Sequence, residues 1–371
     1  MRILFYVSED IFPINNGVTV AISGLSLSLS KYVEVYVYNY KIKQFYKFDA
    51  LKQITKQPEE SIYLTFDLVI CSPLLSIRDF LLKSKNTIKY KKLIGFVSDN
   101  YTYVLWRNIV VSWTVKQITF SDIKSFLKIP LVYIAETLIV SKTDALIVQS
   151  KVEKHIYSKY FIKSPKIFTL PNGTQFTISK NDLTNLQREG VGLVASFNDT
   201  YMKVARWFIA NVWINVIKNN PNMKLYLLGK NSDRLLNYVE KEYPSTSYSV
   251  VVEKYYENIQ DFYLQRLIVV SPIFKNFGLI NKTIEAMHCG CIVIGDKGAF
   301  NGLEDFKNGT HGYVVEDADE FTKKILSVSE IQDEDIRLRA HDFITESLSW
   351  DLNANTILEY LNNFEIKEFK N

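Results

Sequence analysis

The stretch SPIFKNFGLINKTIEAMHCGCIVIGDKGAFNGL, residues 271–303, decides how this chain folds. It predicts a buried strand, a glycine turn at Gly278, a short helix over 280–289 with Gly290 as its C-cap, and a second strand. The N–H groups that open a helix have no partner inside it, so Gly278, Leu279 and the helix start could hold a diphosphate. Glu285 on the same helix could accept hydrogen bonds from ribose hydroxyls. The stretch therefore suits a sugar nucleotide, and a solvated surface carboxylate is the alternative for Glu285.

Short β-rich runs alternate with helical patterns on both sides of this stretch, which is typical of βαβ units in parallel sheets. We expect first-half strands at 3–7, 33–38, 67–71, 93–97, 145–149 and 167–170. We expect second-half strands at 191–197, 224–228, 248–252, 267–271 and 291–295. The pattern predicts an α/β protein with two doubly wound, Rossmann-like domains.

A chain of 371 residues is too long for one ordinary core, so two domains are the natural division. The polar segment 171–190 begins with a Pro-Asn-Gly turn and is the expected linker. We expect one domain over 1–176, joined by the C-terminal helix 350–371, and a second domain over 177–349. That last helix is expected to pack on one domain or to bridge both.

The net charge of +4 conceals two unlike halves. Residues 1–176 carry 23 Lys+Arg against 13 Asp+Glu, whereas residues 177–371 carry 21 against 27. A basic half attracts anionic lipid headgroups or a phosphorylated acceptor, and no nucleic-acid-binding pattern accompanies the charge. Its lysines form two groups, at positions 41, 43, 47, 52 and 56 and at 83, 85, 89, 91 and 92. Peripheral contact with an anionic membrane is one reading, and a solvated lysine-rich face is the other.

The three cysteines, Cys71, Cys289 and Cys291, have neither disulfide-framework nor zinc-site spacing. This usage favours a reducing, cytoplasmic setting. The opening residues MRILFYVSED predict a first strand and not a secretory signal, and no transmembrane helix is expected. We expect neither a metal nor a resident cofactor.

Four further positions could take part in chemistry at strand ends. Gly17 follows the first strand, where it could let the backbone approach a ligand, or it could be an ordinary loop glycine. Ser196, Lys203 and Arg206 follow the strand 191–197, where a cation could neutralise phosphate charge, although a lysine at a helix start is often only exposed. Asp99 could orient a sugar hydroxyl or take a proton from the acceptor, and a helix-cap role is at least as plausible. Two acids near the first strand are rivals of Asp99 in that role: Glu9 and Asp10.

Together these motifs resemble the GT-B glycosyltransferases, specifically the group 1 or GT4-like class, over nearly the whole chain. The resemblance is carried by Ser271, Pro272, Gly278, Lys282, Glu285, Ala286, Met287, Cys289, Gly290, Val293, Gly302 and Leu303, by 144–150 and 171–173, and by 348–351. It implies two Rossmann-like domains that face a cleft and a last helix that crosses back to the N-terminal domain. It also implies a nucleotide sugar, UDP- or GDP-linked, as co-substrate and a glycan, glycolipid or protein-linked hydroxyl as acceptor. The resemblance extends to retention of anomeric configuration, and the absence of a DxD-like pair in the site loops indicates chemistry without a metal.

The chain departs from the pattern of that class at several positions. Phe277 stands where the first glutamate of a double-glutamate motif would be, and Ser98 stands where a histidine is usual. Ser196 aligns with the arginine of a phosphate-binding pair, and Lys203 matches its lysine only with two extra loop residues. These departures leave a second hypothesis open, namely a GT-B-shaped pseudoenzyme that binds nucleotide or acts as a scaffold.

Overall fold

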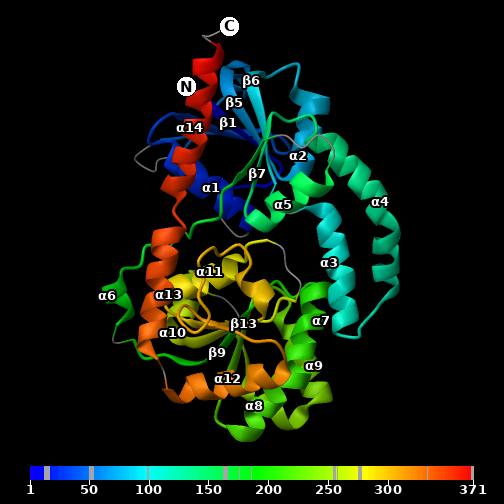
Figure 1. Ribbon diagram of the computed structural model, residues 1–371, viewed down its shortest axis with the longest axis vertical. Helices are drawn as coiled ribbons and strands as arrows, with labels where there is room; N and C mark the ends of the chain where they lie inside the picture. Colours follow the sequence, from blue (N-terminus) through cyan, green and yellow to red (C-terminus); the bar gives the residue numbers. More distant parts are fainter. Residues whose placement is uncertain are drawn as a thin grey trace. The chain divides into compact units, whose positions relative to one another are not determined.

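A computed structural model describes the chain apart from residues 12–16, 50–53, 98–99, 162–165, 175, 185, 254–255, 257, 275–277, 332 and 369–371. The chain forms two compact units (Figure 1). Unit 1 contains Met1–Val104, Ile129–Gln175 and Leu348–Asn371, and unit 2 contains Leu105–Lys128 and Phe176–Ser347. The division differs from the sequence-based one mainly in the segment 105–128, which is grouped with unit 2.

Unit 1 is built on a sheet whose strands lie in the order β4-β3-β2-β1-β5-β6-β7-β8. The strands are β1 (Arg2–Val7), β2 (Glu34–Asn39), β3 (Gln44–Phe48), β4 (Ile54–Gln57), β5 (Thr65–Ser72), β6 (Lys89–Phe96), β7 (Ala145–Val148) and β8 (Lys166–Thr169). Neighbours pair in parallel except where β3 and β4 add an antiparallel edge, with Phe45 opposite Tyr38 and Gln57 opposite Phe45. Buried apolar runs such as 3–5 and 68–70 explain the central strands, because both faces of a parallel sheet are covered.

The helices of unit 1 surround this sheet. They are α1 (Gly17–Leu29), η1 (Glu59–Tyr63), α2 (Leu74–Asp79), η2 (Phe80–Ser84), α5 (Lys151–Tyr160) and α14 (Trp350–Glu368). Two longer helices, α3 (Tyr101–Thr114) and α4 (Phe120–Val140), begin and end respectively in unit 1, and their other ends belong to unit 2. The last helix therefore joins the first unit, where Ala354, Ile357 and Leu361 enter the same core as β1 and α1.

Trp350 fixes the start of α14 inside unit 1. Its indole nitrogen donates to the carbonyl of Thr174 at 3.2 Å, and its ring occupies the space that a side chain at Gly24 or Gly173 would need. The Asp351 carboxylate lies 2.7 Å from the ammonium of Lys31 on the turn after α1. Two glycines distant in the sequence thus share one packing role.

Unit 2 is built on a parallel sheet with the order β11-β10-β9-β12-β13-β14. The strands are β9 (Glu189–Val194), β10 (Leu225–Leu228), β11 (Val250–Glu253), β12 (Arg266–Ser271), β13 (Ile292–Gly295) and β14 (Tyr313–Val314). This is the 3-2-1-4-5-6 order of a doubly wound nucleotide-binding sheet. Its core is closed by the fully buried Trp213, whose indole N–H donates to Ser249 Oγ at 2.9 Å.

The helices of unit 2 follow its strands in βαβ order (Figure 1). They are α6 (Lys180–Leu183), α7 (Asp199–Phe208), η3 (Ile209–Trp213), α8 (Ile214–Asn219), α9 (Ser232–Glu242), η4 (Pro244–Ser249), α10 (Ile259–Gln265), α11 (Asn281–His288), η5 (Lys297–Phe300), α12 (Ala318–Ile331) and α13 (Glu334–Ser347). Side chains define where several of these helices begin. Asn198, for example, starts α7 by accepting a hydrogen bond from the N–H of Tyr201.

The predicted α/β class and each predicted strand are confirmed, with ends shifted by a few residues. Three strands were not predicted: β3, β4 and β14. The first two are short antiparallel strands beyond β2 whose apolar residues are interrupted by polar ones, and β14 has two residues, so none has the long apolar run of a central strand. In the described part of the chain, none of the helices is long and apolar enough to cross a bilayer.

Candidate functional site

The order of strands in unit 2 marks where a ligand would bind. The sheet grows in one direction from β9 through β10 to β11, and in the other from β12 through β13 to β14. Connections therefore leave β9 and β12 toward opposite faces, and the crevice outside the carboxyl ends of such strands is the usual ligand site. The helices that follow these two strands are α7 and α11.

The start of α11 has no side-chain cap. Its N-cap residue is Ile280, which has no polar side-chain atom to accept from the first N–H groups. The first turn is tied to β12 by a buried contact of 3.1 Å between Thr283 Oγ1 and Ser271 Oγ. Gly278 is partly exposed and Leu279 is buried just ahead of the helix. A helix start held this way can present N–H groups to an anion.

Glu285 lies one turn further along α11, partly exposed. Its Oε2 accepts a hydrogen bond from the hydroxyl of Tyr263, which is fully buried on α10, at 3.2 Å. Burial raises the pKa of the Glu285 carboxyl to about 7, against the opposing effect of the Tyr263 hydrogen bond. The pKa of the carboxyl is therefore close to neutral pH, and strongly shifted pKa values of this kind are common in functional sites.

Lys282 shares the exposed side of α11 with Glu285. Its ammonium lies 4.3 Å from the ring centroid of Tyr201 on α7, so α7 and α11 meet at this point. Burial and the positive charge of Arg107 lower the pKa of Lys282 to about 7, and the negative charge of Asp296 acts in the opposite direction. An anion bound here would raise that pKa again, because an opposite charge favours the protonated form.

Asp296 organises the loops at the carboxyl ends of β12 and β13. Its Oδ1 accepts hydrogen bonds from the N–H groups of Ile273 at 2.7 Å and Phe274 at 3.2 Å, and its Oδ2 accepts from Gly298 at 2.8 Å. Sequence reasoning missed this residue, although an acid directly after a buried strand was a usable signal. Asp296 thus joins the residues that follow β12 to those that follow β13.

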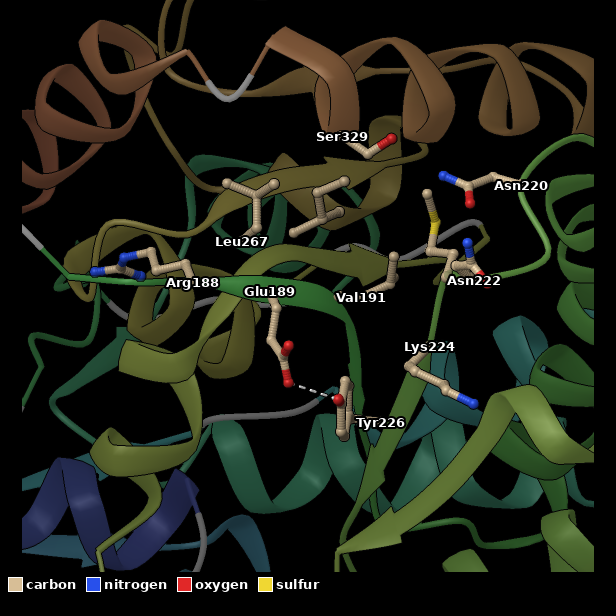
Figure 2. A pocket seen from close by; sticks show the side chains of 12 residues that line it. Arg188, Glu189, Val191, Asn220, Asn222, Lys224, Tyr226, Leu267 and Ser329 are labelled. Atoms are coloured by element: carbon tan, nitrogen blue, oxygen red, sulfur yellow. Dashed lines mark hydrogen bonds between the residues drawn. The ribbon is translucent and has the colours of Figure 1, made fainter.

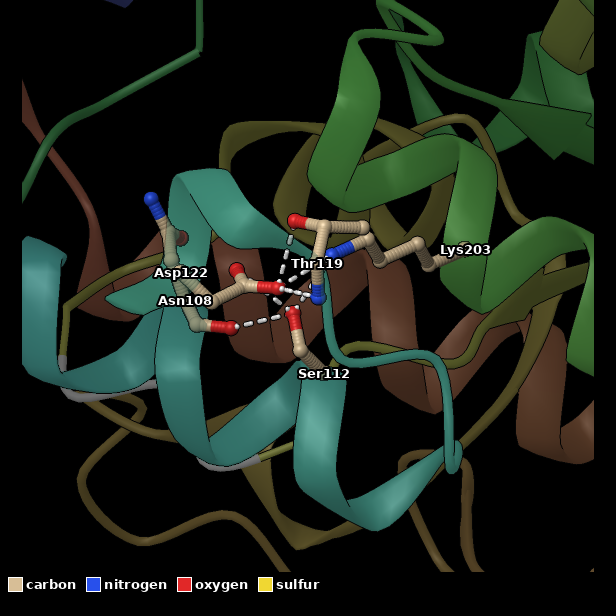
Figure 3. A network of polar contacts seen from close by, with 5 residues as sticks. All are labelled: Asn108, Ser112, Thr119, Asp122 and Lys203. Atoms are coloured by element: carbon tan, nitrogen blue, oxygen red, sulfur yellow. Dashed lines mark hydrogen bonds and ion pairs between the residues drawn. The ribbon is translucent and has the colours of Figure 1, made fainter. Parts of the chain in front are cut away.

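Lys203 was predicted to face a phosphate, and the structure gives it protein partners (Figure 3). Its ammonium lies 2.9 Å from Asp122 Oδ2 and donates to Ser112 Oγ at 2.7 Å. Asp122 also accepts from the N–H and hydroxyl of Thr119, at 2.6 and 2.7 Å. All these groups belong to unit 2, because Ser112, Thr119 and Asp122 lie in the segment 105–128. Sequence reasoning did not foresee this network.

The other predicted site residues are distributed as follows. Ser196 is exposed after β9. Arg206 places its guanidinium over the ring of Tyr238 on α9, 4.7 Å from the centroid. Gly17 begins α1 in unit 1, and Asp99 lies outside the described residues. Lys282 and Glu285 lie three residues apart on α11, and the roles predicted for the other residues stay predictions.

A pocket of about 230 Å³ opens at the other edge of the unit 2 sheet (Figure 2). It is lined by the amino ends of β9, β10 and β12, including Glu189, Tyr226 and Leu267. The hydroxyl of Tyr226 donates to Glu189 Oε1 at 2.8 Å beside it. Because parallel strands have their carboxyl ends at the opposite edge, this pocket is separate from the site on α11. Among the described residues, no group of three or more His, Cys, Asp or Glu could hold a metal ion.

A protein-family model matches the region of the chain that contains α11. Residues 188–330 match the family model described as Glycosyl transferases group 1. The match covers β9 to α12, and so contains Lys282, Glu285 and Asp296. The resemblance that the sequence motifs indicated is confirmed for this part of the chain. No curated protein sequence matches the chain.

Solved structures share the fold of this chain over nearly its whole length. Sucrose-phosphate synthase from Thermosynechococcus elongatus superposes with a TM-score of 0.71 at 16% identity, over 99% of both chains. HepE from Anabaena, solved with UDP and glucose, gives 0.66 at 12% identity, over 97% of this chain and 99% of the other. The catalytic domain of starch synthase IV from Arabidopsis thaliana, bound to ADP and acarbose, gives 0.62 at 12% identity, over 97% and 98%. The fold of this chain is that of the GT-B glycosyltransferases.

Proposed function

We propose that this protein is a glycosyltransferase that moves a sugar from a nucleotide-sugar donor to a hydroxyl acceptor. The observation that carries the proposal is Glu285 on α11, at the topological switch point of a doubly wound sheet, inside the segment that matches the group 1 family. Neighbours solved with UDP or ADP support a nucleotide-linked donor. The donor would be UDP- or GDP-linked.

The donor diphosphate would lie at the uncapped start of α11, beside Lys282, and the ribose hydroxyls would donate to Glu285. Binding the diphosphate would raise the pKa of Lys282, so the ammonium would be charged when the sugar leaves. Fixed N–H groups and the ammonium would then stabilise the charge that grows on the departing diphosphate. This arrangement needs no metal, and the group 1 resemblance suggests retention of anomeric configuration.

The acceptor would be a glycan, a glycolipid or a protein-linked hydroxyl, held by the basic N-terminal half and oriented by Asp99. Peripheral membrane contact is part of the proposal, because a lipid-linked acceptor lies at a membrane surface. The lysines first considered for that contact are weak candidates, since several are paired: Lys43 with Glu59, Lys47 with Glu34, Lys83 with Asp79, and Lys91 with Asp67.

The test is release of nucleoside diphosphate from a panel of UDP- and GDP-sugars. Turnover of one donor by the wild type, lost in Glu285→Ala and kept in Glu330→Ala, would support the proposal. Glu330 is a matched control because it is an exposed acid on α12. Saturable nucleotide binding without release, on every acceptor tried, would instead support the pseudoenzyme, which the serine at position 196 and the phenylalanine at position 277 keep open.

A further inference from the structure

Helix α4 carries a stripe of large apolar side chains that no part of the described chain covers. These residues are 52% to 71% exposed and follow one another at intervals of three or four, so they share one face of the helix. We call them the α4 stripe: Phe120, Ile123, Leu127, Leu131, Ile134 and Leu138. Two more exposed apolar side chains precede it: Trp113 in the last turn of α3 and Ile118 between α3 and α4.

The opposite face of α4 is anchored by two buried carboxylates. Asp122 pairs with Lys203 in unit 2, and Glu136 accepts hydrogen bonds from the N–H and hydroxyl of Thr102 and from the hydroxyl of Tyr157 in unit 1. Burial raises the pKa of Glu136 although these hydrogen bonds act against it. Each part of α4 therefore has a buried carboxylate on the side of the helix away from the stripe, Asp122 in the part that belongs to unit 2 and Glu136 in the part that belongs to unit 1.

The exposed charges of the segment that carries the stripe all have one sign. Between residues 105 and 143 the sequence holds two acids, and they are the buried pair just described. The exposed ionisable groups of this segment are lysines: Lys116, Lys124, Lys128 and Lys142. Lys124 lies over the ring of Phe120, 4.9 Å from its centroid. The segment 105–143 therefore combines exposed apolar side chains with positive charge and exposes no carboxylate of its own.

We propose that the α4 stripe docks on an anionic lipid bilayer, with its leucines and phenylalanine in the headgroup region and the lysines on lipid phosphates. Helices with this composition lie in the plane of an interface, where apolar burial and attraction to anionic headgroups add. An uncovered stripe of this size is unusual on a soluble monomer and marks an interaction site. The inference rests on the proposed function in that docking would bring a lipid-linked acceptor within reach.

Charge separates a bilayer from a second copy of the chain. Two copies meeting through this stripe would bring the same lysines together without an acid to neutralise them, and like-charge juxtaposition at an interface is costly. An anionic bilayer supplies the missing negative charge. Lipid is therefore the occupant that the residues favour.

The experiment is flotation of the full-length protein with phosphatidylcholine vesicles, with and without phosphatidylglycerol, at low and high salt. We expect binding to the anionic vesicles only, weakened by salt. The variant Leu127→Glu/Leu131→Glu should bind at least about tenfold more weakly, since it buries two charges in place of two leucines. The control Ile331→Glu/Leu352→Glu adds the same charge at exposed apolar residues elsewhere and should bind like the wild type.

The variant Lys124→Gln/Lys128→Gln removes two positive charges and leaves the apolar side chains of the stripe unchanged. It should bind anionic vesicles more weakly than the wild type, mainly at low salt. Wild-type protein that binds neither vesicle, or a stripe variant that floats like the control, would overturn the proposal. So would a dimer, seen by light scattering, that the stripe variant dissociates. Donor binding is measured in parallel on each variant. If it is unchanged while flotation fails, the donor site stands and the docking surface does not.

Discussion

The ammonium of Lys203 lies 2.9 Å from the carboxylate of Asp122, although the two residues are 81 positions apart in the chain. Both side chains are mostly buried, with 13% and 11% of their surface exposed. The pair attaches the segment 105–128 to α7 (Figure 3). It also gives a protein partner to Lys203, the lysine for which the sequence predicted contact with a diphosphate. A donor that used Lys203 would have to share or displace this contact.

Breaking the pair from one side should destabilise unit 2. Lys203→Met leaves the Asp122 carboxylate buried without its cation, and we expect a loss of about 1.5 to 3 kcal/mol in the free energy of unfolding. Urea unfolding measures it, and the double variant Lys203→Met/Asp122→Leu should recover part of the loss. If the loss in the double variant equals the sum of the losses in the two single variants, the two groups do not interact.

The same pair should make stability depend on pH in the acid range. Burial acts to raise the pKa of Asp122, but hydrogen bonds from Lys203, Thr119 and Ser112 outweigh it and leave the pKa below its usual value of 3.8. The unfolded carboxyl then takes up a proton before the folded one does. The stabilisation is present above pH 3.8 and is lost as the pH falls through the folded pKa. Thermal melting between neutral and acid pH should show a smaller decline in Asp122→Asn.

Asp122→Asn also tests whether Lys203 reaches the donor. Removing the competing carboxylate should tighten nucleotide-sugar binding if the ammonium contacts the diphosphate, and Lys203→Met should weaken it. Isothermal titration with the donor identified by turnover measures both variants. Unchanged affinity in both would assign Lys203 to structure alone and leave Lys282 as the phosphate-binding lysine.

Two groups should make donor affinity depend on pH near 7, with opposite signs. Ionisation of Glu285 should strengthen binding as the pH rises, because the carboxylate is the better acceptor of ribose hydroxyls, whereas the proton that Lys282 takes up with the diphosphate should weaken it. The Glu285 part is isolated by the ratio of wild-type to Glu285→Gln affinity, which should be up to about tenfold smaller near pH 6 than near pH 8. The raised pKa of Glu285 also makes the stability of the free protein depend on pH, in the opposite direction. The stabilisation that the raised pKa contributes is fully present below the unfolded pKa of 4.5 and is lost as the pH rises through about 7. A wild-type profile identical to that of Glu285→Gln would contradict the assigned contact.

Trp350 and Gly24 should be coupled energetically in unit 1. A methyl group at Gly24 would collide with the indole, so Gly24→Ala should cost about 1 to 3 kcal/mol by overpacking. Trp350→Ala should cost about 3 kcal/mol by leaving a cavity. The double variant should lose less than the sum, because alanine at position 24 can enter the vacated space. Strict additivity in chemical denaturation would rule out the contact.

Chelation should leave turnover unaffected, because the proposed leaving-group stabilisation relies on N–H groups and Lys282. Nucleoside diphosphate release is measured with EDTA and with added magnesium or manganese. A rate that falls with EDTA and returns with one of the metals would show that the mechanism needs a cation.

Local pattern was enough for much of the fold and part of the site. The apolar runs at 191–194 and 267–271 predicted β9 and β12, and the helix between Gly278 and Gly290 was predicted with Glu285 on it. Gly290 ends α11 with φ +69, a conformation that glycine adopts without strain. These features depend on residues close together in the chain, so periodicity and turn chemistry reveal them.

The sequence by itself determined two α/β units and the helix that bears Glu285, because strand and helix periods and glycine positions are local properties. Only the tertiary structure decided which groups surround that helix. Tyr263 reaches Glu285 from α10, and Asp122 reaches Lys203 from the segment 105–128. The outward face of α4 likewise became evident only once its two carboxylates were seen to be buried. Such pairings follow from chain topology, which brings distant residues together and is not encoded in their spacing.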